Sequence, residues 1–304
     1  MTVLGFDTSN YTTSCAWFNG ETGHNSGKLL TVKPGELGLR QSDALFQHVK
    51  RLPEIVESAL EGTDLHGISA IGASTRPRAV EGSYMPCFLA GESQGRVLAR
   101  TLGVPFYAFS HQQGHLAAIL WSSGHMDLME QEFLGWHLSG GTTELLHITP
   151  GLNAEIIGGT DDLSAGQLID RTGQLLGLDF PAGKALDSLS RGVPCKPFPV
   201  KVKDMRFSLS GMQNKAQQLY ASGAGKEEVA AFSLMNCAEA VKKATLQAKK
   251  IYGDLPVVFT GGVSSNTLLR QVMEPLGGLF GPPEYSTDNA MGVAVLTFLA
   301  GENT

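Results

Sequence analysis

Apolar and polar positions follow a strand–turn–strand pattern that occurs twice along the chain. Residues 3–18 read as an apolar run, a polar segment and a second apolar run, and residues 133–148 repeat that order around a Ser-Gly-Gly-Thr-Thr turn. Short apolar runs bounded by turn residues are typical of strands. The pattern therefore predicts that each half of the chain begins with the same hairpin.

The rest of the chain alternates predicted helices with short apolar strands. We expect helices at 41–61, 87–102, 162–177, 226–252, 266–274 and 289–300, and strands at 68–73, 104–108 and 256–260. Pro53 leaves open whether the first helix is divided in two. The alternation predicts an α/β fold with two domains, at 1–128 and 129–304, and a last helix that can pack back on the first domain.

Composition restricts the partners that the whole chain can attract. Its 304 residues carry a net charge of −6, so it does not resemble a free-standing nucleic-acid binder. A local basic patch or a basic partner subunit can still supply phosphate contacts. The 37 glycines cluster with Ser and Thr, which indicates functional turns rather than linkers.

The cysteines and the N-terminal segment bear on location. The four cysteines are widely spaced and form no metal-binding motif, which favours buried thiols in a reducing compartment. The chain starts with an apolar strand rather than a leader, and no apolar run is long enough to span a bilayer. These features predict a cytoplasmic protein.

Gly, Ser and Thr turns can present backbone N–H groups and hydroxyls to a phosphate. The turns at 7–13 and 139–143 predict a nucleotide held between them across a cleft, with Asp7 and carboxylates of the second domain holding a metal against the phosphates. A single turn of this kind usually only reverses the chain. A third turn, at 261–266, opens a helix and suits close approach of a nucleotide; Ser264 or Ser265 is its expected cap.

His111 and His115 are four residues apart, on a helix for which Ser110 is the expected N-cap. This spacing places both imidazoles on one helix face, as metal binding requires, although a solvated or hydrogen-bonded pair is the commoner alternative. Gln112 stands where a zinc protease has its glutamate, so the motif lacks a general base. Asp288 can complete the site or cap the last helix.

The segment 162–187 contains four acids. Asp162 and Asp170 are eight residues apart and are expected on one helix face, while Asp179 and Asp187 follow around a turn with Gly183. The segment is either a helix with a polar face and a loop, or part of a ribose and phosphate site.

In their order along the chain, these motifs resemble the threonylcarbamoyltransferase family that modifies adenosine 37 of tRNA. The resemblance covers nearly the whole chain and rests on the following segments: Phe6-Asp7-Thr8-Ser9, His111-x-x-x-His115, Ser139-Gly140-Gly141-Thr142-Thr143, Ala165-Gly166-x-x-x-Asp170, Leu176-Gly177-Leu178-Asp179-Phe180-Pro181-x-Gly183, Phe207-Ser208-x-Ser210-Gly211, Gly261-Gly262-Val263-Ser264-x-Asn266 and Thr287-Asp288-Asn289.

The resemblance implies a two-domain actin/sugar-kinase/Hsp70-like fold, a duplicated ribonuclease H-like unit. It implies that His111, His115 and Asp288 bind iron or zinc. The implied residues for ATP, AMP or threonylcarbamoyl-adenylate are Ser139, Gly140, Gly141, Thr142, Thr143, Asp170, Gly183, Asp187 and Asn266. The implied enzyme moves the carbamoyl group of the adenylate to N6 of adenosine 37, with tRNA and other subunits of a modification complex as partners and no membrane. No residue is implied as the catalytic base.

The chain departs from the family pattern in ways that predict a divergent paralogue. Thr142 stands where the family has His, and the first turn lacks paired acids. Arg76 and Arg78 replace glycines, and are either an anion site or surface arginines; Gln213 replaces a lysine. These changes leave two alternatives open: a non-catalytic nucleotide-binding partner or regulatory subunit, and a carbamoyltransferase with another acceptor.

Overall fold

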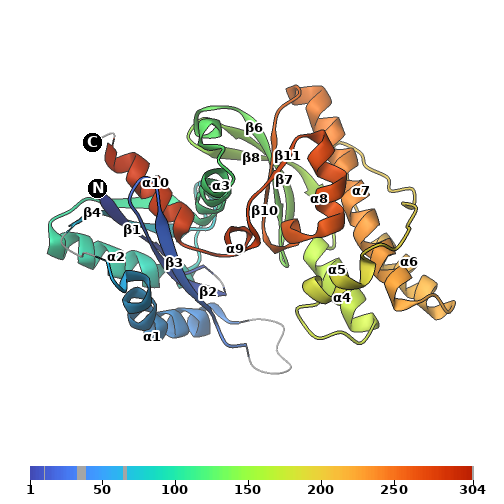
Figure 1. Cartoon of the computed structure of the whole chain (residues 1–304), viewed down its shortest axis with the longest axis horizontal. Coiled ribbons are helices and arrows are strands. Elements are labelled where there is room, and N and C mark those ends of the chain that lie inside the picture. Colours follow the sequence, from blue (N-terminus) through green and yellow to red (C-terminus); the bar gives the residue numbers. More distant parts are fainter. Residues whose placement is uncertain (10, 33–38, 64–66, 303–304) are drawn as a thin grey trace. The chain divides into compact units, whose positions relative to one another are not determined.

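The computed structural model describes residues 1–302 except 10, 33–38 and 64–66. The chain forms two compact units, Met1–Met129 with Thr287–Thr304, and Glu130–Ser286. Figure 1 labels their elements. The predicted boundary between residues 128 and 129 stays a prediction about domains, and the last helix belongs to the first compact unit.

The first unit is built on a five-stranded sheet in the order β3-β2-β1-β4-β5. Its strands are β1 (Thr2–Asp7), β2 (Thr12–Phe18), β3 (Gly23–Leu29), β4 (Ile68–Arg76) and β5 (Phe106–Ser110). The first three are antiparallel, and β4 and β5 extend the sheet in parallel from β1. The strand expected at 68–73 is longer than predicted and runs on to Arg76.

Helices cover this sheet, the first two through an apolar stripe and the last two through consecutive buried residues on all sides. They are α1 (Gln41–Leu60), α2 (Leu89–Leu102), α3 (His111–Ser122) and α10 (Met291–Glu302), with short 3-10 turns at Pro86–Phe88 and Met126–Glu130. Helix α1 continues through Pro53 without division. Helix α2 ends at Gly103, whose φ of 71° gives the left-handed cap expected of glycine.

The second unit repeats the arrangement in a six-stranded sheet of order β11-β10-β6-β7-β8-β9. Its strands are β6 (Phe133–Leu138), β7 (Thr143–Thr149), β8 (Asn153–Thr160), β9 (Arg206–Phe207), β10 (Val257–Thr260) and β11 (Gly278–Phe280). Again three antiparallel strands are followed by two parallel ones beside the first. The predicted repeat of the hairpin is thus part of a repeated sheet.

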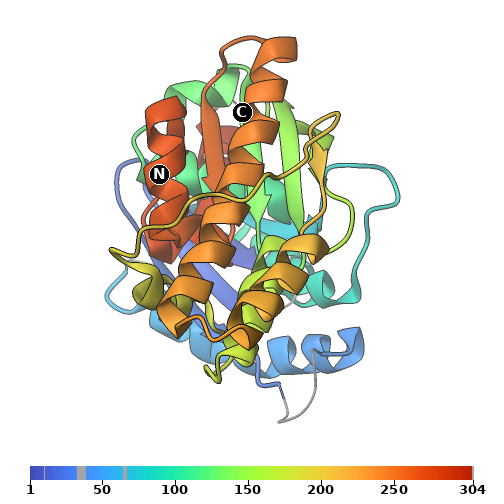
Figure 2. The ribbon, with the colours of Figure 1, turned by 90° about the vertical axis from the view of Figure 1, so that its right-hand side faces the viewer.

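The helices of the second unit are α4 (Ala165–Leu175), α5 (Gly183–Ser190), α6 (Ser210–Ala221), α7 (Lys226–Tyr252), α8 (Thr267–Met273) and the short α9 (Pro283–Ser286). The 3-10 turns Gly262–Ser265 and Glu274–Leu276 flank α8. Helix α7 has the predicted bounds and packs its Cys237 face onto the sheet in the largest core cluster, which includes Trp136. In Figure 2, α7 runs the height of the face turned to the viewer.

Candidate functional site

The first group of predicted site residues lies entirely in the first unit, where α3 and α10 cross. Gly292 on α10 faces Gly114 on α3 so closely that any Cβ at Gly292 would collide with the Gly114 carbonyl. Gly114 lies between the two histidines of α3. The contact of the two backbones therefore places Asp288, three residues before α10, beside the histidines.

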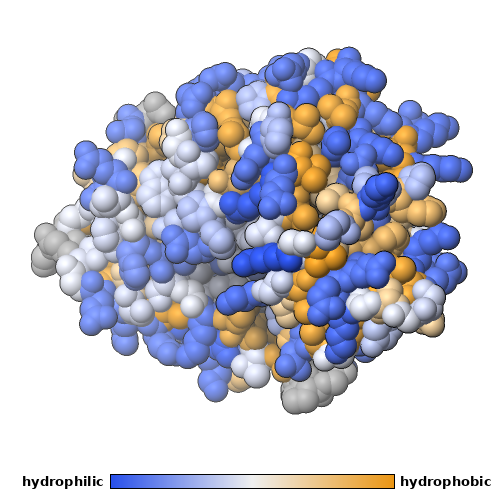
Figure 3. Space-filling model, turned by 45° about the vertical axis from the view of Figure 1, so that its right-hand side comes forward, coloured by the Kyte–Doolittle hydropathy of each residue, from blue (hydrophilic) through white to orange (hydrophobic). Residues whose placement is uncertain are grey.

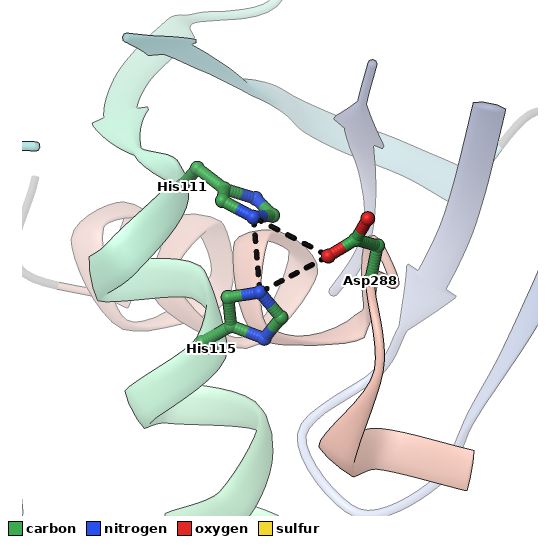
Figure 4. Close-up of side chains that lie close together, drawn as sticks. All are labelled: His111, His115 and Asp288. Atoms are coloured by element: carbon green, nitrogen blue, oxygen red, sulfur yellow. Dashed lines mark hydrogen bonds and ion pairs between the residues drawn. The ribbon is translucent and has the colours of Figure 1, made fainter. Parts of the chain in front are cut away.

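His111, His115 and Asp288 converge on one another, as Figure 4 shows. The two Nε2 atoms are 2.9 Å apart, and Asp288 Oδ1 lies 3.5 Å from that of His111 and 3.3 Å from that of His115. Ligands about 2.0–2.1 Å from one metal ion lie about 3 to 3.4 Å from one another. The three ligand atoms therefore have the spacing of one face of a coordination shell.

Asp7 fixes the orientation of His111. Its Oδ2 lies 2.6 Å from Nδ1 of His111, and its Oδ1 accepts a 2.7 Å hydrogen bond from the Ser9 N–H. Asp7 is only 1% exposed at the end of β1. A carboxylate on the outer ring nitrogen is the usual support of a metal-binding histidine. Donor type, spacing and this support fit a divalent transition metal.

The charges of this cluster oppose the effect of burial. Burial lowers the pKa of His111, but the charge of Asp7 and hydrogen bonds to Asp288 and Asp7 outweigh it and raise the pKa to about 10. Burial raises the pKa of Asp288, yet its hydrogen bonds to the two histidines hold it well below the ordinary value. The cluster therefore favours the ionised form of Asp288 beside the protonated form of His111.

One expectation about this cluster needs correction. Asp288 does not cap α10, since Asn289 Oδ1 accepts the hydrogen bond from the Met291 N–H, at 3.0 Å. The expectation that Asp7 holds a metal together with carboxylates of the other domain stays a prediction; within the first unit its side chain contacts His111 and Ser9. Ser110 does cap α3, in a capping box with Gln113.

The second group of predicted residues lies in the second unit, and a ring of contacts connects it. The turn after β6 lies against the start of α4: the Gly166 N–H donates to the Ser139 carbonyl at 3.2 Å, and Ser164 Oγ donates to the Gly140 carbonyl at 2.8 Å. The Ser139 hydroxyl accepts from the N–H of Thr142 at 3.1 Å. Gly140 and Gly141 have open space where a side chain would stand.

Helices α4 and α5 continue the ring. Asp170 lies one turn after Gly166 on α4, and its Oδ1 accepts a 2.9 Å hydrogen bond from the Ala182 N–H. Burial raises the pKa of Asp170. Gly183, the first residue of α5, lies one helical turn before Asp187.

Asp187 and Asn266 close the ring. Asp187 Oδ1 accepts 2.8 Å hydrogen bonds from the side-chain amide of Asn266 and from both the N–H and the hydroxyl of Thr267. The 3-10 turn before Asn266 follows β10, whose last residue Thr260 pairs with His137 of β6, just before the turn at 139–143. We refer to this set, linked by these hydrogen bonds, by α4 and α5 and by the pairing of β10 with β6, as the contact ring: Ser139, Gly166, Asp170, Ala182, Gly183, Asp187 and Asn266.

Two predictions about the second unit are wrong in detail. Asn266 itself caps α8, through a 2.9 Å hydrogen bond from the Leu269 N–H, instead of Ser264 or Ser265. Asp162 precedes α4 and does not share a helix face with Asp170. Its carboxylate instead accepts hydrogen bonds from Ser208, the Leu209 N–H and Ser210.

The sequence motif at 207–211 therefore contained a signal that we did not use. A Ser-x-Ser segment offers several donors to one carboxylate, and Asp162 is that acceptor. The pairing of the turns at 7–13 and 139–143 across a cleft stays a prediction, because the two turns belong to different units. The first turn also includes residue 10, which is outside the described residues.

The sequence matches a family model and several known proteins. A family model for tRNA N6-adenosine threonylcarbamoyltransferase matches residues 32–295. The chain is 30% identical to the Chloroherpeton thalassium protein of that name, over 99% of this chain and 93% of the relative. It is 31% identical to the Thermus thermophilus protein of that name, over 82% of this chain and 76% of the relative.

Solved structures show the same fold at low identity. Component A of (R)-2-hydroxyglutaryl-CoA dehydratase from Acidaminococcus fermentans matches with a TM-score of 0.60 and 14% identity, over 99% of both chains. A ROK family glucokinase from Streptomyces griseus matches with a TM-score of 0.53 and 13% identity, over 98% of this chain and 100% of that one. The predicted actin/sugar-kinase type of α/β fold is confirmed.

Proposed function

The chain belongs to the tRNA N6-adenosine threonylcarbamoyltransferase family, and on that premise we propose that it moves the threonylcarbamoyl group of threonylcarbamoyl-adenylate, through its carbamoyl carbon, to N6 of adenosine 37 in tRNA. The contact ring is the observation that carries the proposal. It joins residues 139–143 to Asp170, Gly183, Asp187 and Asn266, the set that the family resemblance assigns to the adenylate.

The ring supplies the groups that an adenylate needs. No side chain stands at Gly140 and Gly141, so a phosphate can approach the backbone of the turn closely. The Gly141 N–H already donates to the Ser139 hydroxyl at 3.3 Å. The first turn of α4 lies against the same turn, and the partial positive charge of its N-terminus favours an anion nearby, while its first N–H groups donate to Thr143, Ser139 and Ser164. Asp170 uses only one oxygen for Ala182, so the other is available to accept a hydrogen bond from a ribose hydroxyl.

In this proposal His111, His115 and Asp288 bind iron or zinc. When bound, the ion acts as a Lewis acid toward an oxygen of the donor. Asp7 holds the proton on Nδ1 of His111, so that Nε2 faces the ligand position. The N6 amine then attacks the carbamoyl carbon and loses a proton to water, while the bond to the phosphate oxygen breaks and AMP leaves with that electron pair.

Thr142 supports a second candidate, a nucleotide-binding partner or regulatory subunit without turnover. Its hydroxyl lies 3.0 Å from that of Ser139, so the position where relatives have an imidazole is used for a contact within the turn. A carbamoyltransferase with another acceptor is the third candidate.

We expect a cytoplasmic location and association with other subunits of a tRNA-modification complex. Among the described residues, no helix combines the length and the apolar character of a membrane span.

Transfer to tRNA tests the first proposal directly. The purified full chain is incubated with threonylcarbamoyl-adenylate, unmodified tRNA and partner subunits, and the modified adenosine is measured by mass spectrometry beside a relative as positive control. Modified adenosine supports the enzyme. Calorimetric AMP binding with no product, while the relative works, favours the second candidate. Loss of adenylate without modified adenosine favours another acceptor.

A further inference from the structure

A lysine-lined groove lies on the second unit, outside the contact ring. It has a volume of about 600 Å³ and lies between the segment 200–203 and the second half of α7. In Figure 2 the irregular segment before β9 crosses the face of α7 that is turned to the viewer. Four of its lining residues are lysines, namely Lys201, Lys203, Lys243 and Lys250, and none is acidic within the described part of the chain.

The groove is preformed because α7 holds the opposite wall by hydrogen bonds. Gln247 donates to the Val202 carbonyl at 3.0 Å and accepts from the Met205 N–H at 2.9 Å. Lys243 Nζ donates to the Val200 carbonyl at 3.1 Å. The lysine-bearing segment thus loses little freedom when a ligand binds, which favours affinity.

A tight hairpin ends this wall. Lys203 and Arg206 exchange two backbone hydrogen bonds, and the two residues between them, Asp204 and Met205, have φ values of 51° and 59°. Two central residues with positive φ define the turn that matches the twist of paired strands. This turn keeps Lys203 at the rim of the groove although neither central residue is glycine.

Three of the lysines carry charge that the protein does not neutralise. Lys201, Lys203 and Lys250 are exposed, and no carboxylate of the described residues lies within ion-pair distance of them. Lys243 is shared between Val200 and a Glu239 oxygen 4.0 Å away. In a chain of net charge −6, this is a local concentration of positive charge.

We propose that this groove binds the phosphate backbone of RNA, with tRNA as the RNA if the proposed function holds. Lys243 and Lys250 are seven residues apart on α7, about 10 Å along the axis, so both can contact phosphates of one strand. The floor is aliphatic, with Val202 and the exposed side chain of Leu246, and offers a surface for ribose. Lysines act as point charges, so they position a backbone without reading sequence.

Hydrophilic side chains, blue in Figure 3, cover much of the face that comes forward in that view, with apolar patches between them. The groove combines lysines with the aliphatic side chains of Val202 and Leu246. An extended strand of nucleotides matches this mixed lining better than a compact apolar partner would. An acidic protein segment is the competing ligand, and the experiment separates the two.

The test compares two triple variants of the full chain with equal loss of charge. One carries Lys201→Gln, Lys203→Gln and Lys250→Gln. The control carries Lys28→Gln, Lys50→Gln and Lys226→Gln, three exposed lysines outside the groove. Binding of labelled tRNA is measured by fluorescence anisotropy between 50 and 300 mM salt, with polyglutamate as second ligand and AMP affinity and Tm as checks on the fold.

We expect the groove variant to bind tRNA at least about tenfold more weakly at 0.1 M salt, with a log–log salt slope shallower by about 2 to 3, since each lost phosphate contact removes about 0.7 to 0.9. The control should keep most of the affinity and slope. Equal losses in both variants, absence of tRNA binding by the unchanged chain, or binding of polyglutamate in place of tRNA would each overturn the proposal. Groove-dependent RNA binding without modified adenosine would uphold it while the proposed function fails.

Discussion

Asp7 Oδ2 lies 2.6 Å from Nδ1 of His111, so a buried carboxylate at the end of the first strand holds the first histidine of α3. The two residues are 104 positions apart in the chain. Their contact leaves Nε2 of His111 facing His115 and Asp288. The orientation of the predicted metal ligands therefore depends on a residue that need not touch the metal.

Replacement of Asp7 by Asn should weaken metal binding about 10- to 100-fold, as is usual when the outer partner of a metal-binding histidine is removed. The amide keeps the shape but loses the charge that orients the imidazole. Titration of the purified protein with zinc or iron against a competing chelator measures the affinity. Asp43→Asn, at an exposed position of α1, is the matched control. Unchanged affinity in the Asp7 variant would show that it does not support the site.

Gly166→Ala should disturb the turn at 139–143. A Cβ at this position would lie 2.6 Å from Gly140 Cα and from the Ser139 carbonyl oxygen, closer than real Cβ contacts. We expect a loss of about 1 to 3 kcal/mol in the free energy of unfolding, together with weaker AMP binding. Urea unfolding and calorimetry measure the two effects.

Gly211→Ala is the control for that glycine. Gly211 is in the first turn of α6. Apart from its chain neighbours and the backbone of its own helix, no atom lies within 4 Å of a Cβ placed there. Its replacement should leave stability unchanged or slightly raised. If both alanine variants behaved alike, close contact between α4 and the turn would not matter for stability.

The strand and helix pattern of this chain could largely be read from its sequence, because apolar periodicity records which faces are buried. Helix α7 has the predicted bounds. Strand β3 was missed, since its sequence Gly-His-Asn-Ser-Gly-Lys-Leu is polar and it lies at the edge of its sheet, where exposed backbone pairs on one side only.

The site was harder to predict because its contacts join distant segments. The i, i+4 spacing of His111 and His115 is local, and it placed both side chains correctly on one face. Asp288 was ambiguous because a carboxylate before a helix is more often a cap, and only the packing of α10 on α3 decides its direction. Nothing local in the sequence indicates that Asp7 would contact His111.

Stability should fall as the pH drops from 6.5 to about 4, in part because of His48. Burial lowers the pKa of this histidine from 6.5 to about 4, so in this window the unfolded chain takes up a proton that the folded chain does not. His48→Gln removes that proton uptake. The stability of the wild type relative to the variant should therefore decrease between pH 7 and pH 4.5 in urea unfolding.

The control for His48 is His24→Gln, at an exposed position of β3. The pH dependence of this control should follow that of the wild type. If the His48 variant also kept the wild-type pH dependence, neutral burial of the imidazole would not contribute to the acid sensitivity of the fold.

Asp187→Asn should lower both stability and AMP affinity, because Asp187 is 7% exposed and its Oδ1 accepts three hydrogen bonds from Asn266 and Thr267. The amide of the variant has one acceptor oxygen where the carboxylate has two. Its NH2 group would face hydrogen-bond donors that need an acceptor. The cost of a buried unsatisfied group is about 1 to 3 kcal/mol, measured by urea unfolding. Ser188→Ala, the next and exposed position of α5, is the control and should change neither quantity. Lower stability with unchanged AMP affinity would confine Asp187 to holding α5 and α8 together, whereas loss of both would support its place beside the adenylate.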